Sequence, residues 1–100
     1  MNEDSFYEKC YKILRKVPPG KVTTYKDIAK CLNSKAYRAV GTAMNKNPYA
    51  PSVPCHRVIN SDGKVGNFAS GQGKKIIMLK KEGIEIKNGK INLKKFGYKF

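Results

Sequence analysis

The stretch TTYKDIAKCLNSKAYRAVGTAMNKNP, residues 23–48, predicts two short helices joined by a tight turn. Either Thr23 or Thr24 can cap the first helix, because both hydroxyls precede an apolar stripe at helical spacing. After a turn at Asn33-Ser34, a second helix is expected from Lys35 to Asn45. In a basic chain such a pair is typical of a helix-turn-helix, whose second helix enters a DNA groove. The pattern alone also fits a helical core that binds no ligand.

A further helix is expected before this pair. Apolar residues recur along one of its faces from Phe6 to Val17, and Cys10 lies among them as a core residue. Pro18-Pro19-Gly20 ends the helix, because proline lacks an amide donor and disfavours helical geometry in the residue before it.

Two β-hairpins are expected after residue 54. Val58-Ile59 and Lys64-Val65 flank the turn-forming residues 60–63, and Ile84–Lys87 and Lys90–Leu93 flank Asn88-Gly89. Asn-Gly suits the positive φ angles of a type I′ turn.

A last helix is expected from Lys74 to Glu82, with Gly83 in the C′ position. The preceding Gly71 and Gly73 lack the GK[ST] signature of a phosphate-binding loop. The fold class expected is mainly α, a winged-helix-like helix-turn-helix DNA-binding domain with small β-hairpins.

Length and charge limit the functions that this chain can have. Its 100 residues fit one domain, 1–100, too small to hold a large cofactor in its interior, and no cofactor is expected. The 21 Lys and Arg against 7 Asp and Glu give a net charge of +14, which favours a polyanionic partner, although a lysine-rich surface can also serve solubility alone.

The sequence offers little for a metal site, a disulfide framework or a membrane anchor. Three cysteines cannot all pair in disulfides. The chain has one histidine and no CxxC spacing, so no metal site is expected. There is no apolar run long enough to span a membrane, and the polar N-terminus does not resemble a signal peptide. The protein is expected in the cytoplasm, on the nucleoid of a prokaryote, or in the nucleus of a eukaryote.

The segment Pro54-Cys55-His56-Arg57-Val58-Ile59 carries the clearest chemistry. A thiol becomes a nucleophile when it is deprotonated, and a nearby imidazole or positive charge stabilises the thiolate. If the segment is extended, Cys55 and His56 point to opposite faces, and a water could connect them. A carboxylate commonly orients such a histidine. Glu82, at the end of the last helix, is the best-placed acid, although spacing alone does not select it.

The order of several blocks resembles one family. Pro54-Cys55-His56-Arg57-Val58 is similar to the active-site motif of the O6-alkylguanine-DNA alkyltransferases, which move an alkyl group from guanine onto their own cysteine. The similarity runs from about Phe6 to Ile86. It includes Gly20–Tyr25, Arg38–Met44, Asn47-Pro48, Gly63–Phe68 and Glu82-Gly83.

The resemblance implies a role for each residue of the reaction. Cys55 would accept the alkyl group, His56 would act as the base through a water, and Glu82 would hold the histidine tautomer. Tyr25 would donate a hydrogen bond to the guanine ring, near the phosphate of the flipped nucleotide. Because sulfur keeps the alkyl group, the protein would react once. The partner would be double-stranded DNA containing O6-alkylguanine.

The same resemblance implies a DNA-binding helix and a pocket. Arg38 would enter the stack where the damaged base has left. Small residues would let the helix approach the minor groove, and Asn47 would brace the turn after it. The DNA-binding residues expected are Ala36, Arg38, Ala39, Gly41 and Thr42, together with Tyr25. The pocket residues expected are Met44, Asn47, Val58 through its carbonyl, Phe68, and Ala69 through its amide. Taken singly, each of these residues also has an ordinary structural explanation.

Two departures from the family pattern keep an alternative open. No N-terminal companion domain is expected, because 100 residues leave no room for one. The smaller alkyltransferase-like proteins, which bind O6-alkylguanine and recruit another repair pathway, also lack that domain. Those proteins have lost the cysteine, whereas this chain keeps Cys55. Phe68 stands where the family often has tyrosine, and Ala69-Ser70 replaces its usual residues. A plain helix-turn-helix regulator is a further alternative. A monomer is expected, and a repair-protein partner is left unnamed.

Overall fold

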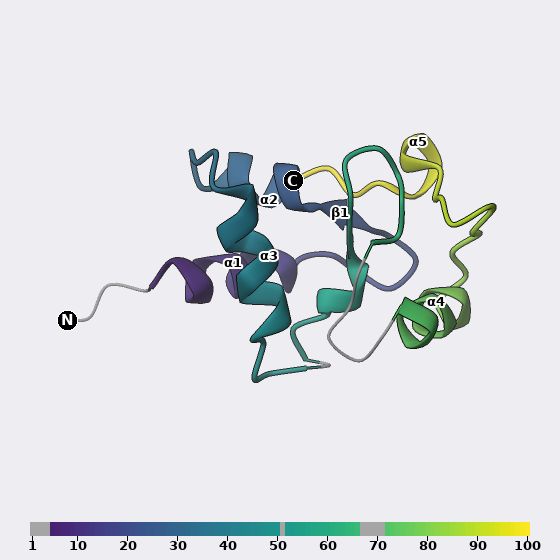
Figure 1. The fold of residues 1–100 in the computed structure, drawn as a ribbon, viewed down its shortest axis with the longest axis horizontal. Coiled ribbons are helices and arrows are strands. Elements are labelled where there is room, and N and C mark those ends of the chain that lie inside the picture. The colour runs from purple at the N-terminus through teal and green to yellow at the C-terminus, as the bar shows by residue number, and fades with distance from the viewer. Residues whose placement is uncertain (1–4, 51, 67–71) are drawn as a thin grey trace.

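The computed structural model describes residues 5–50, 52–66 and 72–100, with two groups of helices at opposite ends of the molecule (Figure 1). One group consists of α1 (Phe6–Leu14), α2 (Tyr25–Cys31) and α3 (Tyr37–Asn45), and the other of α4 (Gln72–Lys81) and α5 (Leu93–Phe96). Between them lie the strands β1 (Thr23–Thr24) and β2 (Val58–Ile59) and the 3-10 turn Cys55–Arg57. The mainly helical fold predicted from the sequence is confirmed. None of the helices described is long and apolar enough to cross a membrane.

Side-chain caps set the starts of α1 and α2. The Ser5 hydroxyl accepts a hydrogen bond from the Glu8 amide at 3.1 Å, and the Thr24 hydroxyl accepts one from the Asp27 amide at 3.0 Å. Thr24 is therefore the cap, and Thr23 is not. The α1 helix ends at Leu14, short of the predicted Val17, because the amides after it bond three residues back and tighten the chain. Val17 is nevertheless buried, as its place in the stripe predicted.

The helix predicted from Lys35 begins instead at Tyr37, so Ala36 is its N-cap residue. Alanine has no oxygen with which to cap, and no side-chain bond closes this end of α3. The Ser34 hydroxyl accepts from the Ala36 amide at 3.0 Å, and this turn delays the first helical residue.

The predicted hairpin between Val58-Ile59 and Lys64-Val65 is wrong. The β2 strand pairs in parallel with β1, with Thr23 opposite Val58 and Thr24 opposite Ile59. The turn itself forms, with hydrogen bonds from the Asn60 amide to the Lys64 carbonyl at 3.0 Å and from the Gly63 amide to the Asn60 carbonyl at 2.9 Å, but Lys64 pairs with Lys90 instead. The physical reason is burial: Val58 and Ile59 are both fully covered, which a hairpin strand with one solvated face would not allow.

The second predicted turn is confirmed, although its strands are shorter than expected. Asn88 and Gly89 have φ angles of 53° and 74°, and Lys87 and Lys90 exchange two backbone hydrogen bonds of 2.9 Å across them. The second strand stops early because Asn92 caps α5, with its side chain accepting from the amides of Lys94 and Lys95.

The buried apolar side chains form two clusters. The first cluster joins the three N-terminal helices to the cysteine segment, and the second joins α4 to the C-terminal turns. The first contains Cys10, Tyr11, Leu14, Val17, Ile28, Ala29, Val40, Ala43, Met44, Val53, Cys55 and Val58. The second contains Val22, Ile59, Val65, Leu79, Ile84, Ile91 and Phe96. Val58 and Ile59 are adjacent in the chain but lie in different clusters, so β2 connects the two.

Candidate active site and nucleic-acid interface

The cysteine segment is a 3-10 turn, and its predicted extended geometry is wrong. The Arg57 amide donates to the Pro54 carbonyl at 2.9 Å, which closes the turn over Cys55 and His56. Both side chains are largely covered, since Cys55 is 6% and His56 3% exposed. In such a turn successive side chains do not alternate between two faces. The side chains of Cys55 and His56 are therefore not held on opposite faces, as an extended segment would require.

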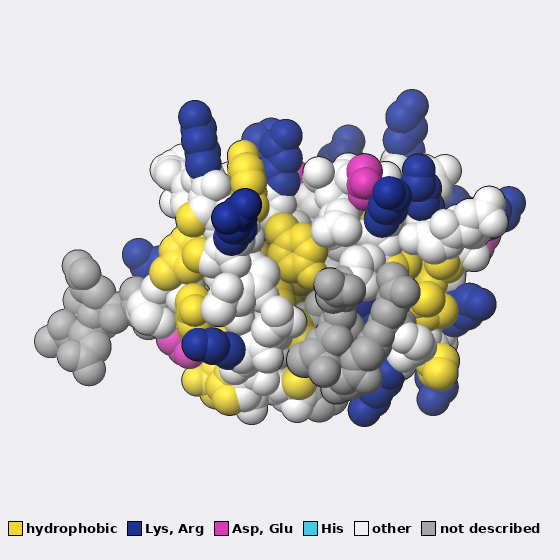
Figure 2. Space-filling model, viewed as in Figure 1, with side chains coloured by type: hydrophobic (Ala, Val, Ile, Leu, Met, Phe, Trp, Pro, Cys, Tyr) yellow, Lys and Arg dark blue, Asp and Glu magenta, His cyan; other side chains and the backbone are white. Residues whose placement is uncertain are grey.

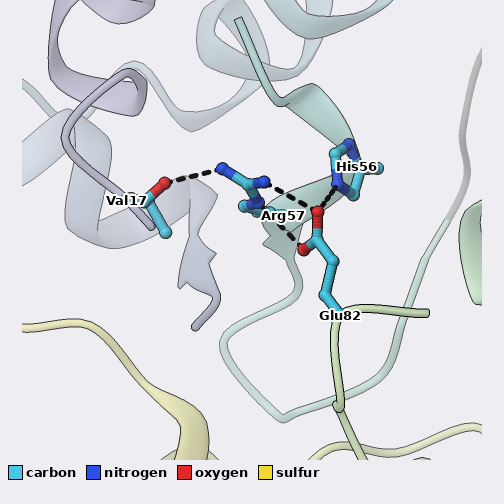
Figure 3. Close-up of polar contacts among 4 residues, drawn as sticks. All are labelled: Val17, His56, Arg57 and Glu82. Atoms are coloured by element: carbon cyan, nitrogen blue, oxygen red, sulfur yellow. Dashed lines mark hydrogen bonds and ion pairs between the residues drawn. The ribbon is translucent and has the colours of Figure 1, made fainter. Parts of the chain in front are cut away.

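Glu82 joins His56 and Arg57 into one network (Figure 3). Its Oε2 lies 2.9 Å from His56 Nε2 and 2.7 Å from an Arg57 terminal nitrogen, and its Oε1 accepts from Arg57 Nε at 2.9 Å. Another Arg57 nitrogen donates to the Val17 carbonyl at 2.8 Å. Since a carboxylate only accepts, His56 carries its proton on Nε2 and keeps the lone pair on Nδ1 for use as a base.

The end of α4 sets the position of Glu82. Gly83 has a φ angle of +91°, its amide bonds the Lys80 carbonyl at 3.0 Å, and the Ile84 amide bonds the Leu79 carbonyl at 3.1 Å. This is the Schellman arrangement that the predicted C′ glycine implied. Burial raises the pKa of the Glu82 carboxyl, but the hydrogen bonds from Arg57 and His56 outweigh it and hold that pKa below its usual value. Glu82 is therefore a carboxylate at neutral pH.

Lys75 is a site residue that the sequence did not reveal. Its side chain is 0% exposed, and Nζ donates to the Val58 carbonyl at 2.7 Å. Burial lowers the pKa of Lys75 to about 8, while the negative charge of the Cys55 thiolate acts in the opposite direction. The Val58 carbonyl that the ammonium binds lies three residues after Cys55, which brings Lys75 to the cysteine segment. Nothing marked Lys75 among the many lysines except its neighbourhood to the glycine-rich segment.

Tyr25 approaches the site from the other side. It is the first residue of α2, held there by the Thr24 cap, and burial followed by the charge of Cys55 raises the pKa of its hydroxyl. Tyr25 therefore keeps its proton and can donate a hydrogen bond. It also lines an open cavity of about 480 Å³, which extends from α2 to the start of α3 and the turn at residues 60–62. The residues of this cavity are Tyr25, Lys26, Tyr37, Arg38, Asn60, Ser61 and Asp62.

The predicted DNA-binding residues lie on or next to α3, but they differ in accessibility. Arg38 is exposed and reaches the same cavity, and its carbonyl accepts from the Thr42 hydroxyl at 3.1 Å. A Cβ built on Gly41 would meet nothing within 4 Å, so this face of the helix is open. Ala36 is exposed and Ala39 is half-buried.

The predicted pocket residues fall into three groups. Asn47 braces the turn after α3, donating to the Val53 carbonyl at 2.8 Å and accepting from the Tyr49 amide at 2.9 Å. Met44 and Val58 are buried in the first cluster with Cys55, and the Val58 carbonyl already accepts from Lys75. Phe68 and Ala69 lie outside the described residues.

Positive charge dominates the surface. Figure 2 shows many Lys and Arg side chains and few Asp and Glu side chains on the visible face, in line with the net charge of +14. Within the described ranges, no group of three or more His, Cys, Asp or Glu side chains is arranged to hold a metal ion.

Comparison with known proteins gives consistent matches. Residues 5–84 match the model of the 6-O-methylguanine DNA methyltransferase DNA-binding domain. The chain is 49% identical over 78 residues to a methylated-DNA–protein-cysteine methyltransferase of Methanosarcina barkeri, covering 77% of this chain and 49% of that protein. It is 40% identical over 99 residues to a bifunctional methyltransferase/endonuclease of Picrophilus torridus, covering 98% of this chain and 33% of that protein. The chain thus spans a third to about half the length of these curated relatives.

Among solved structures, the matches to S. pombe Atl1 and to S. pombe ATL in complex with DNA extend over both full lengths. Atl1 of S. pombe, in complex with damaged DNA containing O6-carboxymethylguanine, superposes with a TM-score of 0.85 at 36% identity and covers 100% of both chains. Because the family model covers residues 5–84 of the 100, the chain belongs to the family of the 6-O-methylguanine DNA methyltransferase DNA-binding domain.

Proposed function

We propose that this chain repairs O6-alkylguanine in DNA by moving the alkyl group irreversibly onto Cys55. The observation that carries the proposal is the position of Cys55 beside a histidine whose proton is fixed by a carboxylate. His56 Nε2 lies 2.9 Å from Glu82, and Arg57 holds the same carboxylate through two further bonds. A purely structural cysteine does not need this arrangement.

The chemical step follows from these groups. His56 Nδ1 would take the proton of the Cys55 thiol through a water, and the buried Lys75 ammonium would stabilise the thiolate. The sulfur attacks the alkyl carbon, a carbon–sulfur bond forms, and the carbon–oxygen bond breaks with its electron pair on guanine O6. Guanine ends as the neutral base with a proton on N1, which balances the proton lost by the thiol.

Tyr25 and α3 would prepare the nucleotide for this step. The alkylated oxygen is out of reach inside the duplex, so the nucleotide must rotate out at a cost of a few kcal/mol. Arg38, which is exposed at the start of α3, would fill the space left in the stack. The Tyr25 hydroxyl, which keeps its proton, would donate to a ring nitrogen of guanine as negative charge develops there.

Intact-mass measurement tests the proposal. Incubation with a duplex that carries one O6-methylguanine should add one methyl group to the wild-type chain and none to Cys55→Ala. A matched variant, Cys31→Ala, removes an exposed cysteine outside the site and should still gain the methyl group. No mass gain in the wild type, with binding to the duplex intact, would contradict alkyl transfer.

The second candidate is a damage sensor that binds O6-alkylguanine without removing the alkyl group. The likeness to Atl1 of S. pombe, whose solved structure is a complex with damaged DNA containing O6-carboxymethylguanine, favours it. A sensor would bind the alkylated duplex more tightly than an unmodified duplex of the same sequence, and Cys55→Ala would not change its action. A sequence-specific regulator would instead not discriminate between the two duplexes.

A further inference from the structure

Tyr37 is an exposed aromatic residue that the reaction described above does not use. It is the first residue of α3, immediately before Arg38, and its side chain is 42% exposed. A large aromatic ring that stays exposed removes little of its apolar area from water, so the Tyr37 ring contributes little to the hydrophobic core. An exposed aromatic ring within a basic surface is, however, suited to contact with nucleic-acid bases.

The surroundings of Tyr37 point to the same surface that Arg38 occupies. Both residues line the open cavity of about 480 Å³, together with Tyr25 and the turn at residues 60–62. Tyr25 is half-buried and lies on the Cys55 side, as the effect of Cys55 on its pKa indicates. Tyr37 is the more exposed of the two residues.

Helix geometry separates the roles of the two adjacent residues. Successive residues on a helix point about 100° apart, so Tyr37 and Arg38 cannot fill the same gap in a base stack. If Arg38 takes the place of the extruded base, the Tyr37 ring remains available for a neighbouring nucleotide. Proteins that bind the minor groove frequently press apolar or aromatic side chains against base steps in this way.

We propose that Tyr37 is a second DNA-contacting side chain, whose ring packs on the nucleotide that flanks the flipped one. The inference rests on the proposed function in one respect, that α3 faces the DNA at the lesion. Tyr37 would then add affinity for the opened duplex and help to hold the gap that Arg38 fills.

The absence of tryptophan from the sequence allows a direct test. Tyr37→Trp introduces the only tryptophan, and stacking on a base quenches tryptophan emission. Tyr49→Trp is the matched control, because Tyr49 is similarly exposed, 39%, but packs against Tyr11 and Arg15. The emission of the Tyr37→Trp chain should fall on binding to an O6-methylguanine duplex, and that of the control should change little.

A binding measurement completes the test. Stacking on one base is worth about 1–3 kcal/mol, so Tyr37→Ala should weaken binding to the O6-methylguanine duplex by roughly 5- to 150-fold, and Tyr37→Phe should restore most of it. If wild type binds while Tyr37→Ala binds equally well and the tryptophan is not quenched, the inference is wrong. Weaker binding of Tyr37→Ala without methyl uptake by the wild type would contradict alkyl transfer alone. A wild-type chain that does not bind the duplex would contradict both.

Discussion

The two hydrophobic clusters are built by different means. In the first, three helices pack their apolar stripes against one another and against the cysteine segment, and side-chain caps close the starts of α1 and α2. In the second, α4 is the one described helix of more than four residues, and the remaining members come from the short β2 and α5, from a β-bridge at Val22 and from irregular segments. The first cluster is the scaffold that presents α3, whereas the second holds Glu82 and Lys75 against the cysteine turn.

This difference in construction shows why the candidate site depends on both hydrophobic clusters. Cys55 lies in the first cluster, but its partners Glu82 and Lys75 come from α4 and the residue after it. Arg57 bonds to Glu82 on one side and to the Val17 carbonyl on the other. The reactive geometry therefore exists only while the two clusters stay docked, and experiments that loosen this junction should act on transfer before they act on DNA binding.

Replacement of Glu82 should have the largest effect. In Glu82→Gln the amide cannot accept from His56 and Arg57 together without presenting a donor to one of them, and a buried guanidinium loses its counterion. We expect transfer to slow by about 100-fold or more and the free energy of unfolding to fall by about 2–4 kcal/mol. Single-turnover mass measurement and urea unfolding check the two values.

The pH dependence of this variant separates charge from shape. Because the folded state lowers the pKa of Glu82 below its ordinary 4.5, the carboxylate stabilises the fold above that pH and loses this effect as the pH falls through the folded-state pKa. The stability difference between wild type and Glu82→Gln should therefore shrink below pH 4.5. A difference that stays constant to pH 3 would show that packing and not charge causes it.

Matched cavities in the two clusters come next. Leu14 and Leu79 are both fully buried, one in each cluster, and Leu→Ala at either should cost about 3 kcal/mol. We expect Leu79→Ala to speed amide hydrogen exchange at Ile84 and Ile91 while the amide of Val40 stays protected, because the second cluster can open alone. Leu14→Ala should speed exchange in both. Equal changes in the two variants would show one cooperative unit.

The sequence predicted what short-range chemistry determines. A threonine cap at residue 23 or 24, the Gly83 helix end and the Asn88-Gly89 turn each need only neighbouring residues, so their signals are complete within a few positions. The parallel pair of β1 with β2 was missed because two-residue strands far apart in the chain carry no periodicity. Lys75 was missed because lysine is rarely buried, and only the fold provides the carbonyl that it needs.

Removal of the buried ammonium should have a moderate effect on transfer. In Lys75→Met the thiolate of Cys55 loses the cation near it, while methionine fills the same space, so we expect about a tenfold slower transfer at pH 7. Because the pKa of Lys75 is about 8, the wild type loses this charge at higher pH, and the two rates should converge above pH 8. Lys75→Arg, which keeps the charge, is the control. Equal transfer rates of the wild type and Lys75→Met at pH 7 would show that the role of Lys75 is limited to its hydrogen bond with the Val58 carbonyl.

Two glycines provide the smallest and most discriminating comparison. Gly41 has helical backbone and open space around its Cβ position, so Gly41→Ala should raise the free energy of unfolding by about 0.5–1 kcal/mol. Gly83 has a φ angle of +91°, so Gly83→Ala should lower it by about 1 kcal/mol although nothing obstructs the methyl group.

The two glycine substitutions should affect different functions, DNA binding for Gly41→Ala and alkyl transfer for Gly83→Ala. Gly41→Ala adds a methyl group to the α3 face that we propose lies against DNA, so it should weaken binding to the alkylated duplex while leaving the chain more stable. Gly83→Ala should leave binding unchanged and slow transfer, because it disturbs the turn that positions Glu82. Urea unfolding, duplex binding and methyl uptake measured on both variants test this. Reduced DNA binding in Gly83→Ala would show that the second cluster also holds α3 in place. The assignment of DNA binding to the first cluster and of transfer to the second would then be wrong.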